Sequence, residues 1–194
     1  PARAGAQPTL FLDSAHGEVV DAFIRGGDYR NTVYNSSVLQ TKANSNGSFR
    51  RRALLKFDTQ NFVPENASIQ SATLTVTLKS SESSTRTIGA YRVSTSFDEG
   101  AATWYRRKST GDRWTSSGGD LGSRYATARV GTSGGTRVTF NVTSLVQSTV
   151  RGNYGSRYTR IALVDEGGSS ASSLKEFHSS ESSDASARPK LTVV

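Results

Sequence analysis

The sequence predicts an all-β protein: an antiparallel β-sandwich with about nine or ten strands and at most one short helix. Apolar and polar residues alternate over many short segments, which is the pattern of half-buried strands. Clusters of glycine, serine and asparagine separate these segments, as turns between antiparallel strands require. Apolar residues at helical spacing occur only within 143–152, and this combination of features is typical of a sandwich.

The predicted strands follow one another along the whole chain. Each combines alternating apolar residues, often β-branched or aromatic, with a turn-forming end. In order, the segments are PTLFL, EVVDAFIRGG, SSVLQTK, RRRALLKFDT, IQSATLTVTLKSS, TRTIGAYRV, TRVTFNV, SRYTRIALVDEGG, LKEFHSS and RPKLTVV. Between the seventh and the eighth, TSLVQSTVRG has helical spacing and ends in a glycine, so the single helix is expected there.

The alternation also predicts which residues face the core, because successive side chains of a strand point to opposite faces of the sheet. The longest alternation, within 72–79, sets apolar residues against threonines and one lysine. The residues predicted to face the core are Val20, Ala22, Ile24, Leu39, Thr41, Ala53, Leu55, Phe57, Ala72, Leu74, Val76, Leu78, Val138, Phe140 and Val142.

Residues 95–130 interrupt this regular pattern. The segment is rich in glycine, serine and arginine, and it contains both tryptophans of the chain. Long irregular excursions in compact domains are often functional. We expect Trp104 to be a core anchor beneath the excursion, whereas Trp114 is equally suited to packing and to supporting a sugar ring.

Length and composition place limits on the function. The 194 residues suit one domain, residues 1–194, and no cysteine is present for a disulfide framework or a thiolate site. No run of about 18 apolar residues occurs, so no membrane partner is expected.

The formal charge of +8 arises from 18 arginines and 6 lysines against 16 acidic residues. Because a guanidinium group binds carboxylate, sulfate or phosphate through two parallel hydrogen bonds, this excess of arginine indicates an anionic partner. Nucleic acid, an anionic surface and an acidic polysaccharide all qualify.

Four basic residues are predicted to share one sheet face. Arg25, Lys42, Arg52 and Lys56 lie opposite the apolar set on three consecutive strands, which usually neighbour one another. The competing interpretation is an ordinary solvated outer face. We favour a cationic platform, because like charges on adjacent strands repel unless a ligand relieves the repulsion. The same argument places further basic residues on the non-core side, namely Arg137, Arg160, Lys175 and Lys190.

Eight short segments, in their order and spacing, resemble the DNRLRE-type domain, a group that includes carbohydrate-binding module family 96. These segments are DAFIRGGDY, VLQTK, RRALLKFD, SIQSATLTV, FDEGAATW, FNVTSLVQ, EFHSSE and RPKLTV, and they extend from about Val19 to Val193. One departure is NTVYNSS, where many relatives read Asn-Tyr-Gly. The resemblance implies a jelly-roll sandwich that binds carbohydrate without catalysis.

The resemblance, together with the arginine excess, predicts a module for an acidic uronic acid polysaccharide, with alginate as the first candidate. It implies a secreted or extracellular bacterial protein, present as a monomer within a larger enzyme that degrades polysaccharides. The predicted ligand-binding residues are the basic ones, with Tyr29 and His178 for a sugar ring or hydroxyl. In full they are Arg25, Tyr29, Lys42, Arg50, Arg51, Arg52, Lys56 and His178.

The alternative function is a jelly-roll lyase that cleaves a uronic acid polymer by β-elimination. Such an enzyme needs a group that neutralises the carboxylate and a base, and Arg25 with Tyr29, Tyr34 or Tyr91 satisfies the composition. The Tyr-Phe-Lys-Ala-Gly motif of familiar jelly-roll alginate lyases is absent. We therefore predict no catalytic residues.

Nucleic acid is the other rival partner, because TWYRRKSTGDRW interleaves basic and aromatic residues that can grip phosphates and stack bases. No pattern of a known nucleic-acid-binding module accompanies it. No cofactor is predicted. A structural calcium ion is an open option, for which Asp21, Asp28, Asp98 and Asp165 offer oxygens, although no Asp-x-Asp-x-Asp-Gly loop exists.

Overall fold

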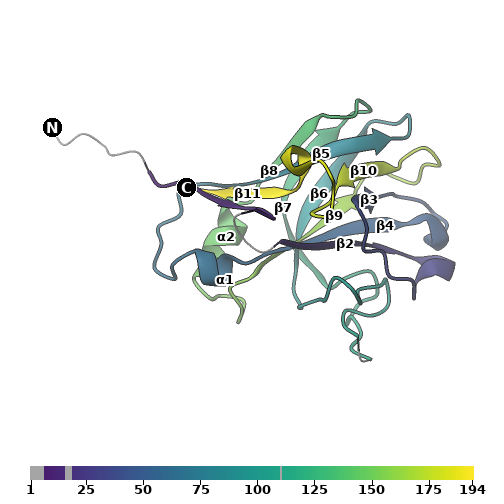
Figure 1. Cartoon of the computed structure of the whole chain (residues 1–194). Coiled ribbons are helices and arrows are strands. Elements are labelled where there is room, and N and C mark those ends of the chain that lie inside the picture. The colour runs from purple at the N-terminus through teal and green to yellow at the C-terminus, as the bar shows by residue number, and fades with distance from the viewer. Residues whose placement is uncertain (1–6, 16–18, 110) are drawn as a thin grey trace.

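The computed structural model describes residues 7–15, 19–109 and 111–194, and these form a β-sandwich of two antiparallel sheets (Figure 1). This confirms the predicted fold class. The described residues contain eleven strands, one more than the upper expectation, and two α-helices instead of one. Successive strands mostly alternate between the two sheets, which is the chain path of a jelly roll.

The first sheet is built around its longest strand, β5. One edge of β5 pairs with β8, and the other edge pairs with β11 and β10, which lie end to end; β1 pairs with β11 and β3 with β10. The strands of this sheet are β1 (Leu10–Leu12), β3 (Val38–Thr41), β5 (Ala72–Ser81), β8 (Arg137–Asn141), β10 (Lys175–His178) and β11 (Lys190–Val193).

The second sheet has five strands in the order β2-β4-β9-β6-β7. It contains β4, the strand that begins within the run of three arginines, as an inner strand between β2 and β9. Its strands are β2 (Val19–Arg25), β4 (Arg51–Phe57), β6 (Arg86–Val93), β7 (Leu121–Val130) and β9 (Thr159–Asp165).

The two α-helices are short and lie side by side at one end of the sandwich (Figure 1). The predicted helix is α2 (Thr143–Val150), which buries an apolar side against the core. The unpredicted α1 (Thr59–Phe62) begins at Asp58, whose carboxylate accepts a hydrogen bond from the Asn61 backbone N–H at 2.9 Å and so caps the helix. Three 3₁₀ turns complete the set: η1 (Gly27–Tyr29), η2 (Gly47–Phe49) and η3 (Ala185–Ala187). Within the described residues, no helix is long and apolar enough to span a membrane.

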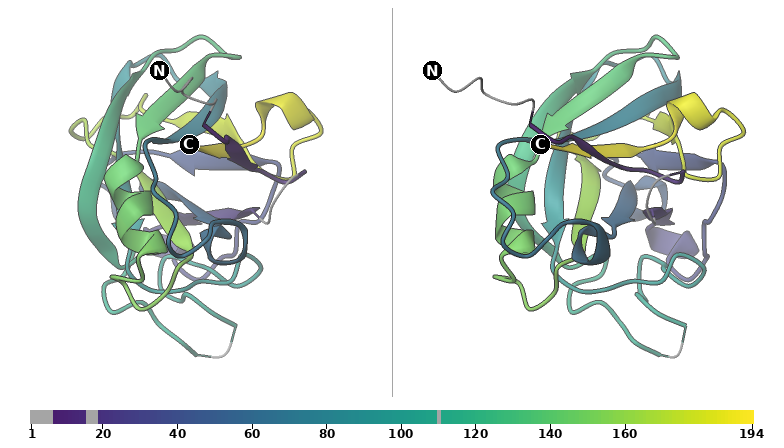
Figure 2. Two further views of the ribbon diagram at one scale, coloured as in Figure 1. Left: turned by 90° about the vertical axis from the view of Figure 1, so that its left-hand side faces the viewer. Right: turned by 60° about the vertical axis from the view of Figure 1, so that its left-hand side comes forward.

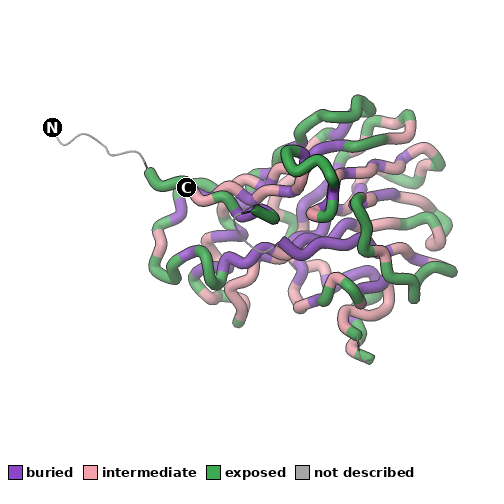
Figure 3. Tube along the Cα trace, in the orientation of Figure 1, coloured by how far each residue is buried: buried purple, intermediate pink, exposed green. Residues whose placement is uncertain are grey.

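The main core lies between the two sheets and confirms most of the predicted inward residues. The apolar residues of β4, β5 and β8 that were expected inside belong to it, for example Leu55, Leu74 and Phe140. Figure 3 shows the consequence, with buried chain along the middle of the strands and exposed chain in the loops at their ends.

The prediction for β2 was wrong, because this strand is apolar on both faces. Val19, not Val20, contributes to the core between the sheets, and Val20 and Ile24 belong to a second apolar cluster. The register agrees: Ala22 lies opposite Leu54, and Leu54 also belongs to the second cluster. Alternation within a strand cannot identify the core face when both faces are buried.

The second apolar cluster exists because the excursion between β6 and β7 folds back over the outer face of the second sheet. This loop lies below the sandwich in Figure 1, and Figure 2 shows it from two other sides. Trp114, rather than Trp104, is the buried anchor: it is 5% exposed, and its indole N–H donates to the Thr103 carbonyl at 2.8 Å. Trp104 packs at the edge of the cluster and stays partly exposed.

Candidate functional site

A cavity of about 280 Å³ opens at one end of the second sheet. Its walls are the turn between β3 and β4 and the loop that follows β9, and Trp104 closes one side. Arg50, Arg51 and Arg52, the three consecutive arginines of the sequence, all line it. Arg51 and Arg52 begin β4 and lie on its opposite faces, and Arg50 directly precedes the strand, so the three arginines meet at this end of the sheet without sharing a face.

Arg52 forms the inner wall together with Trp104. Its guanidinium carbon lies 4.9 Å from the centre of the Trp104 ring, and its Nη1 donates to the Gly118 carbonyl at 2.5 Å. Gly118 has φ +94°, and a Cβ there would lie 2.7 Å from both Arg52 Nη1 and Trp104 Cζ2, so the close approach requires glycine. Burial lowers the pKa of Arg52, and the neighbouring charge of Arg50 lowers it further.

Arg50 and Arg51 form the outer part of the wall. Arg50 is exposed, and its Nε donates to the Asn44 carbonyl at 2.9 Å. Arg51 donates from Nη1 to Gln40 Oε1 at 2.8 Å, while its buried Nε has no hydrogen-bond partner among the described residues. None of the three arginines forms an ion pair with another described residue. Burial, and then the charge of Arg25, lowers the pKa of Arg51, while the charges of Glu176 and Glu82 partly oppose this shift.

The acidic residues of the cavity wall are already engaged. Asp165 accepts from Arg86 Nε at 2.9 Å, and Glu166 accepts from the Tyr91 hydroxyl at 2.5 Å and from Arg124 at 3.1 Å. The free polar capacity of the cavity is therefore mainly cationic.

An aromatic pair lies beside this cavity. Arg25 stacks on the Tyr29 ring at 3.5 Å and lies 5.9 Å from the Phe49 ring, and its Nε donates to the Ser48 carbonyl at 2.8 Å. Tyr29 is 41% and Phe49 is 43% exposed, which is unusual for large side chains that η1 and η2 hold in place. Sequence reasoning missed Phe49, although an aromatic residue in a polar loop just before three arginines was a usable signal.

The chain matches the family described as carbohydrate-binding module family 96 over residues 16–194. It belongs to this family. The resemblance inferred from the short segments is thereby confirmed, and the chain is a carbohydrate-binding module. No curated protein matches it.

In this module, the predicted platform of four basic residues on one face does not form. Arg25 lies opposite Arg51 in the register of β2 and β4, whereas Ile24 lies opposite Arg52. Arg25 and Arg52 are thus on opposite faces of the sheet. The error follows from the wrong face assignment of β2. When the two faces of this strand are exchanged, Arg25 lies on the face that points to the sandwich interior.

Lys42 was also predicted on the platform, but it is buried and paired. Its Nζ lies 2.8 Å from a carboxylate oxygen of Glu82 and 2.6 Å from the Ala171 carbonyl, and its side chain is only 8% exposed. Burial opposes the shift, but the hydrogen bond from Lys42, followed by the hydrogen bond from the Leu174 backbone N–H, lowers the pKa of Glu82. Lys42 is therefore a structural residue whose charge is already neutralised.

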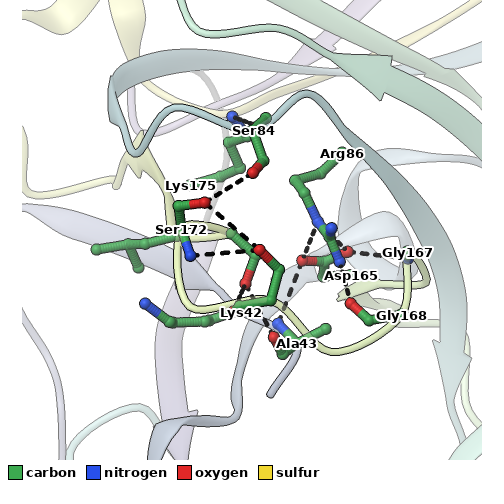
Figure 4. A network of polar contacts seen from close by, with 12 residues as sticks. Lys42, Ala43, Ser84, Arg86, Asp165, Gly167, Gly168, Ser172 and Lys175 are labelled. Carbon is green, nitrogen blue, oxygen red and sulfur yellow. Dashed lines mark hydrogen bonds and ion pairs between the residues drawn. The ribbon is translucent and has the colours of Figure 1, made fainter.

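Lys175, predicted on the non-core side, is fully buried (Figure 4). Lys175 lies on the same face of β10 as the buried Phe177. Because side chains alternate along a strand, the sequence already placed these two residues on one face. The Lys175 Nζ donates to Ser81 Oγ at 2.6 Å and to the carbonyls of Ser84 and Gly131 at 2.5 and 2.8 Å. Burial lowers the pKa of Lys175, and the nearby positive charge of Arg86 lowers it further. Arg137, Arg160 and Lys190 do lie on non-core positions.

Two other predicted ligand residues are not at the cavity. Lys56 is on the outer face of β4, opposite Arg160 in register and 5.7 Å from the Tyr158 ring. His178 is on β10 of the other sheet, with Nδ1 2.8 Å from Ser182 Oγ, and burial lowers its pKa. Of the predicted residues, Lys42, Arg50, Arg51 and Arg52 line the cavity, Lys42 with its charge already paired, and Arg25 and Tyr29 lie beside it.

A separate acidic cluster consists of Asp21, Glu99 and Glu181, which come from three distant segments of the chain and lie near Lys56. Asp21 is fully buried, with Oδ2 accepting from the Ser180 N–H at 2.8 Å and Oδ1 without a partner among the described residues. Burial raises the pKa of Asp21 well above its usual range, and the negative charge of Glu181 raises it further. Burial and a hydrogen bond with Glu181 raise the pKa of Glu99 to about 7.

The aspartates considered for calcium do not assemble. Asp28 accepts from the Ser48 hydroxyl at 3.0 Å, Asp165 pairs with Arg86, and Asp98 is exposed. As placed in 7–15, 19–109 and 111–194, no three histidine or acidic side chains could hold a metal ion.

The acidic cluster makes stability depend on pH. A carboxyl group whose pKa is raised by folding stabilises the folded state while protonated, and this contribution is lost as the pH rises from about 5 to about 8. Over this range Glu99 contributes a fall in melting temperature, which the lowered pKa of His178 opposes, and Glu99→Gln, which stays neutral, should remove the Glu99 contribution. Part of the pH dependence should remain in this variant, because the pKa of Asp21 is also raised.

Thermal melts at a series of pH values test this expectation. Glu65→Gln is the matched control, because it removes the same carboxyl group from an exposed position outside the acidic cluster. The expectation fails if the profiles of Glu99→Gln and Glu65→Gln both run parallel to that of the wild type.

Proposed function

We propose that this module binds an acidic polysaccharide at the cavity lined by Arg50, Arg51, Arg52 and Trp104, with a uronic acid polymer such as alginate as the first candidate. The observation that carries the proposal is that three consecutive arginines line one cavity, and none of them forms an ion pair with a described carboxylate. A bound carboxylate would supply the missing negative charge and accept two hydrogen bonds from one guanidinium.

The dimensions favour a site on a polymer over one that encloses a small molecule. A volume of about 280 Å³ is just below the range of typical small-molecule sites, roughly 300–1,000 Å³. The cavity therefore suits one part of a longer chain, with neighbouring sugar units on the surface outside. The exposed rings of Tyr29 and Phe49 offer apolar contact for such a unit.

The role we propose is binding without catalysis. A lyase needs a base, and a tyrosine serves as one more readily when its pKa is lowered. The hydrogen bond to Glu166 instead raises the pKa of Tyr91. His178, the one histidine in the described residues, is on the other sheet. We infer that the module serves as a monomeric, secreted targeting unit of a bacterial polysaccharide-degrading enzyme, as the family resemblance suggests.

Affinity electrophoresis tests the partner. We expect alginate in the gel to retard the module, and neutral glucans to leave its migration unchanged. Retardation by neutral glucans alone would contradict an acidic ligand, and equal retention by DNA at physiological salt would indicate a generic cation exchanger. Incubation with alginate should not increase ultraviolet absorbance, because such a rise would reveal the unsaturated product of a lyase.

A further inference from the structure

A basic hairpin projects from the excursion over the second sheet. We define it as the two arms 105–108 and 111–113, which carry Arg106, Arg107, Lys108 and Arg113 with Asp112 as their one acidic residue. Arg106 and Arg113 face each other in an antiparallel bridge, and the Arg107 N–H donates to the Asp112 carbonyl at 2.9 Å. The loop that contains it extends away from the sandwich (Figures 1 and 2).

The base of the basic hairpin is firmly held. Thr103 Oγ1 accepts from the N–H groups of Tyr105 and Arg106 at 3.2 and 2.8 Å, and the buried Trp114 donates to the Thr103 carbonyl. The Asp98 N–H donates to the Arg107 carbonyl at 3.0 Å. The arms are therefore positioned by hydrogen bonds and by a buried aromatic anchor, which favours a preformed surface.

The basic hairpin adjoins the cavity. Trp104, which lines the cavity, is followed directly by Tyr105, the first residue of the hairpin, about 3.8 Å further along the chain. The Tyr105 N–H donates to the Arg30 carbonyl at 3.1 Å, which adds another exposed arginine to the same region.

Most of these charges lack a partner. Arg107 lies 3.6 Å from Asp112, but Arg30, Arg106 and Arg113 form no ion pair with any described residue. Arg106 also has a buried Nε without a hydrogen-bond acceptor in the described part of the chain. Like charges held this close repel one another, and an anionic ligand along the hairpin would remove the repulsion.

We propose that the basic hairpin is a second anion-binding subsite, which continues the cavity so that the module holds at least two acidic units of one polysaccharide chain. This proposal rests on the proposed function. The carboxylate in the cavity contacts the arginines that line it, and a later unit of the same chain contacts Arg106 and Arg113.

The structure favours a polysaccharide over a nucleic acid here. Single-stranded nucleic acids bind by stacking bases on free aromatic faces. In this region Arg113 stacks on the Tyr105 ring at 4.3 Å and donates to its hydroxyl at 2.6 Å, and Arg52 stacks on Trp104. One face of each aromatic ring is therefore already covered by a guanidinium group.

The test compares Arg106→Ala/Arg113→Ala with Arg129→Ala/Arg137→Ala, which removes the same charge from exposed positions on β7 and β8. Binding of long alginate and of a disaccharide prepared from alginate is measured by calorimetry over a series of salt concentrations. We expect the hairpin variant to bind long alginate about tenfold more weakly, from two solvent-exposed charge-assisted contacts, and with a shallower salt dependence. Its affinity for the disaccharide should equal that of the wild type. Circular dichroism and melting curves establish that each variant is folded.

The outcomes separate the two proposals. If the hairpin variant binds long alginate as the control does, the second subsite is overturned while the cavity stands. If it loses disaccharide binding equally, the hairpin is part of the primary site and the separate subsite is wrong. If Arg50→Ala/Arg52→Ala leaves all alginate binding intact, the proposed function of the cavity fails. If calorimetry with single-stranded DNA shows that the hairpin variant loses DNA binding while it keeps alginate binding, the assigned partner is overturned.

Discussion

Replacing Arg50 and Arg52 together by alanine is expected to weaken alginate binding by about 2 kcal/mol, or about thirtyfold, because two charge-assisted contacts are lost. Both guanidinium groups line the cavity without a described carboxylate partner, so the bound anion is their principal counter-charge. Calorimetry at moderate salt gives the affinity, and lower salt should increase the difference because screening weakens.

Two comparisons make this result specific. Arg129→Ala/Arg137→Ala lowers the net charge equally at exposed positions and should keep most of the affinity. Arg52→Lys keeps the charge but loses the planar fork and the stacking on Trp104, so it should recover only part of the binding. An equal loss in the Arg129/Arg137 variant would mean that net charge, not the cavity, determines binding.

Lys175→Ala is expected to lower the free energy of unfolding by about 3–5 kcal/mol, the largest single effect on stability that we predict. The truncation leaves a cavity at a position that is 0% exposed, and it leaves the carbonyls of Ser84 and Gly131 and the Ser81 hydroxyl without this donor. The network in Figure 4 would lose the group that ties β10 to the loop after β5 and to the end of β7.

Urea unfolding measures the change, with Lys79→Ala as control. Lys79 is exposed on β5, so its removal changes the net charge equally but should alter stability by less than about 0.5 kcal/mol. Lys175→Met restores much of the volume but not the hydrogen bonds, and we expect intermediate stability. If Lys175→Ala unfolds at the same urea concentration as Lys79→Ala, the buried lysine has no structural role.

Much of the candidate site was visible in the sequence, because its central part is local. Arg50, Arg51 and Arg52 are consecutive, and a strand that starts at such a run must bring the three side chains to one end of a sheet. Arg25 and Tyr29, also predicted, lie beside them. The wrong residues are those whose environment is made by distant chain. Glu82 neutralises Lys42, and the loops after β5 and β7 enclose Lys175.

The sequence by itself determined the fold class, the helix at α2, the core faces of β4, β5 and β8, and the family, because these depend on patterns within single segments. Only the tertiary structure decided which face of β2 is the core face and which tryptophan is buried. The excursion between β6 and β7 covers the outer face of the second sheet, so residues on both faces of β2 leave water. Alternation specifies which side chains share a face, but the solvent exposure of that face depends on what packs against it.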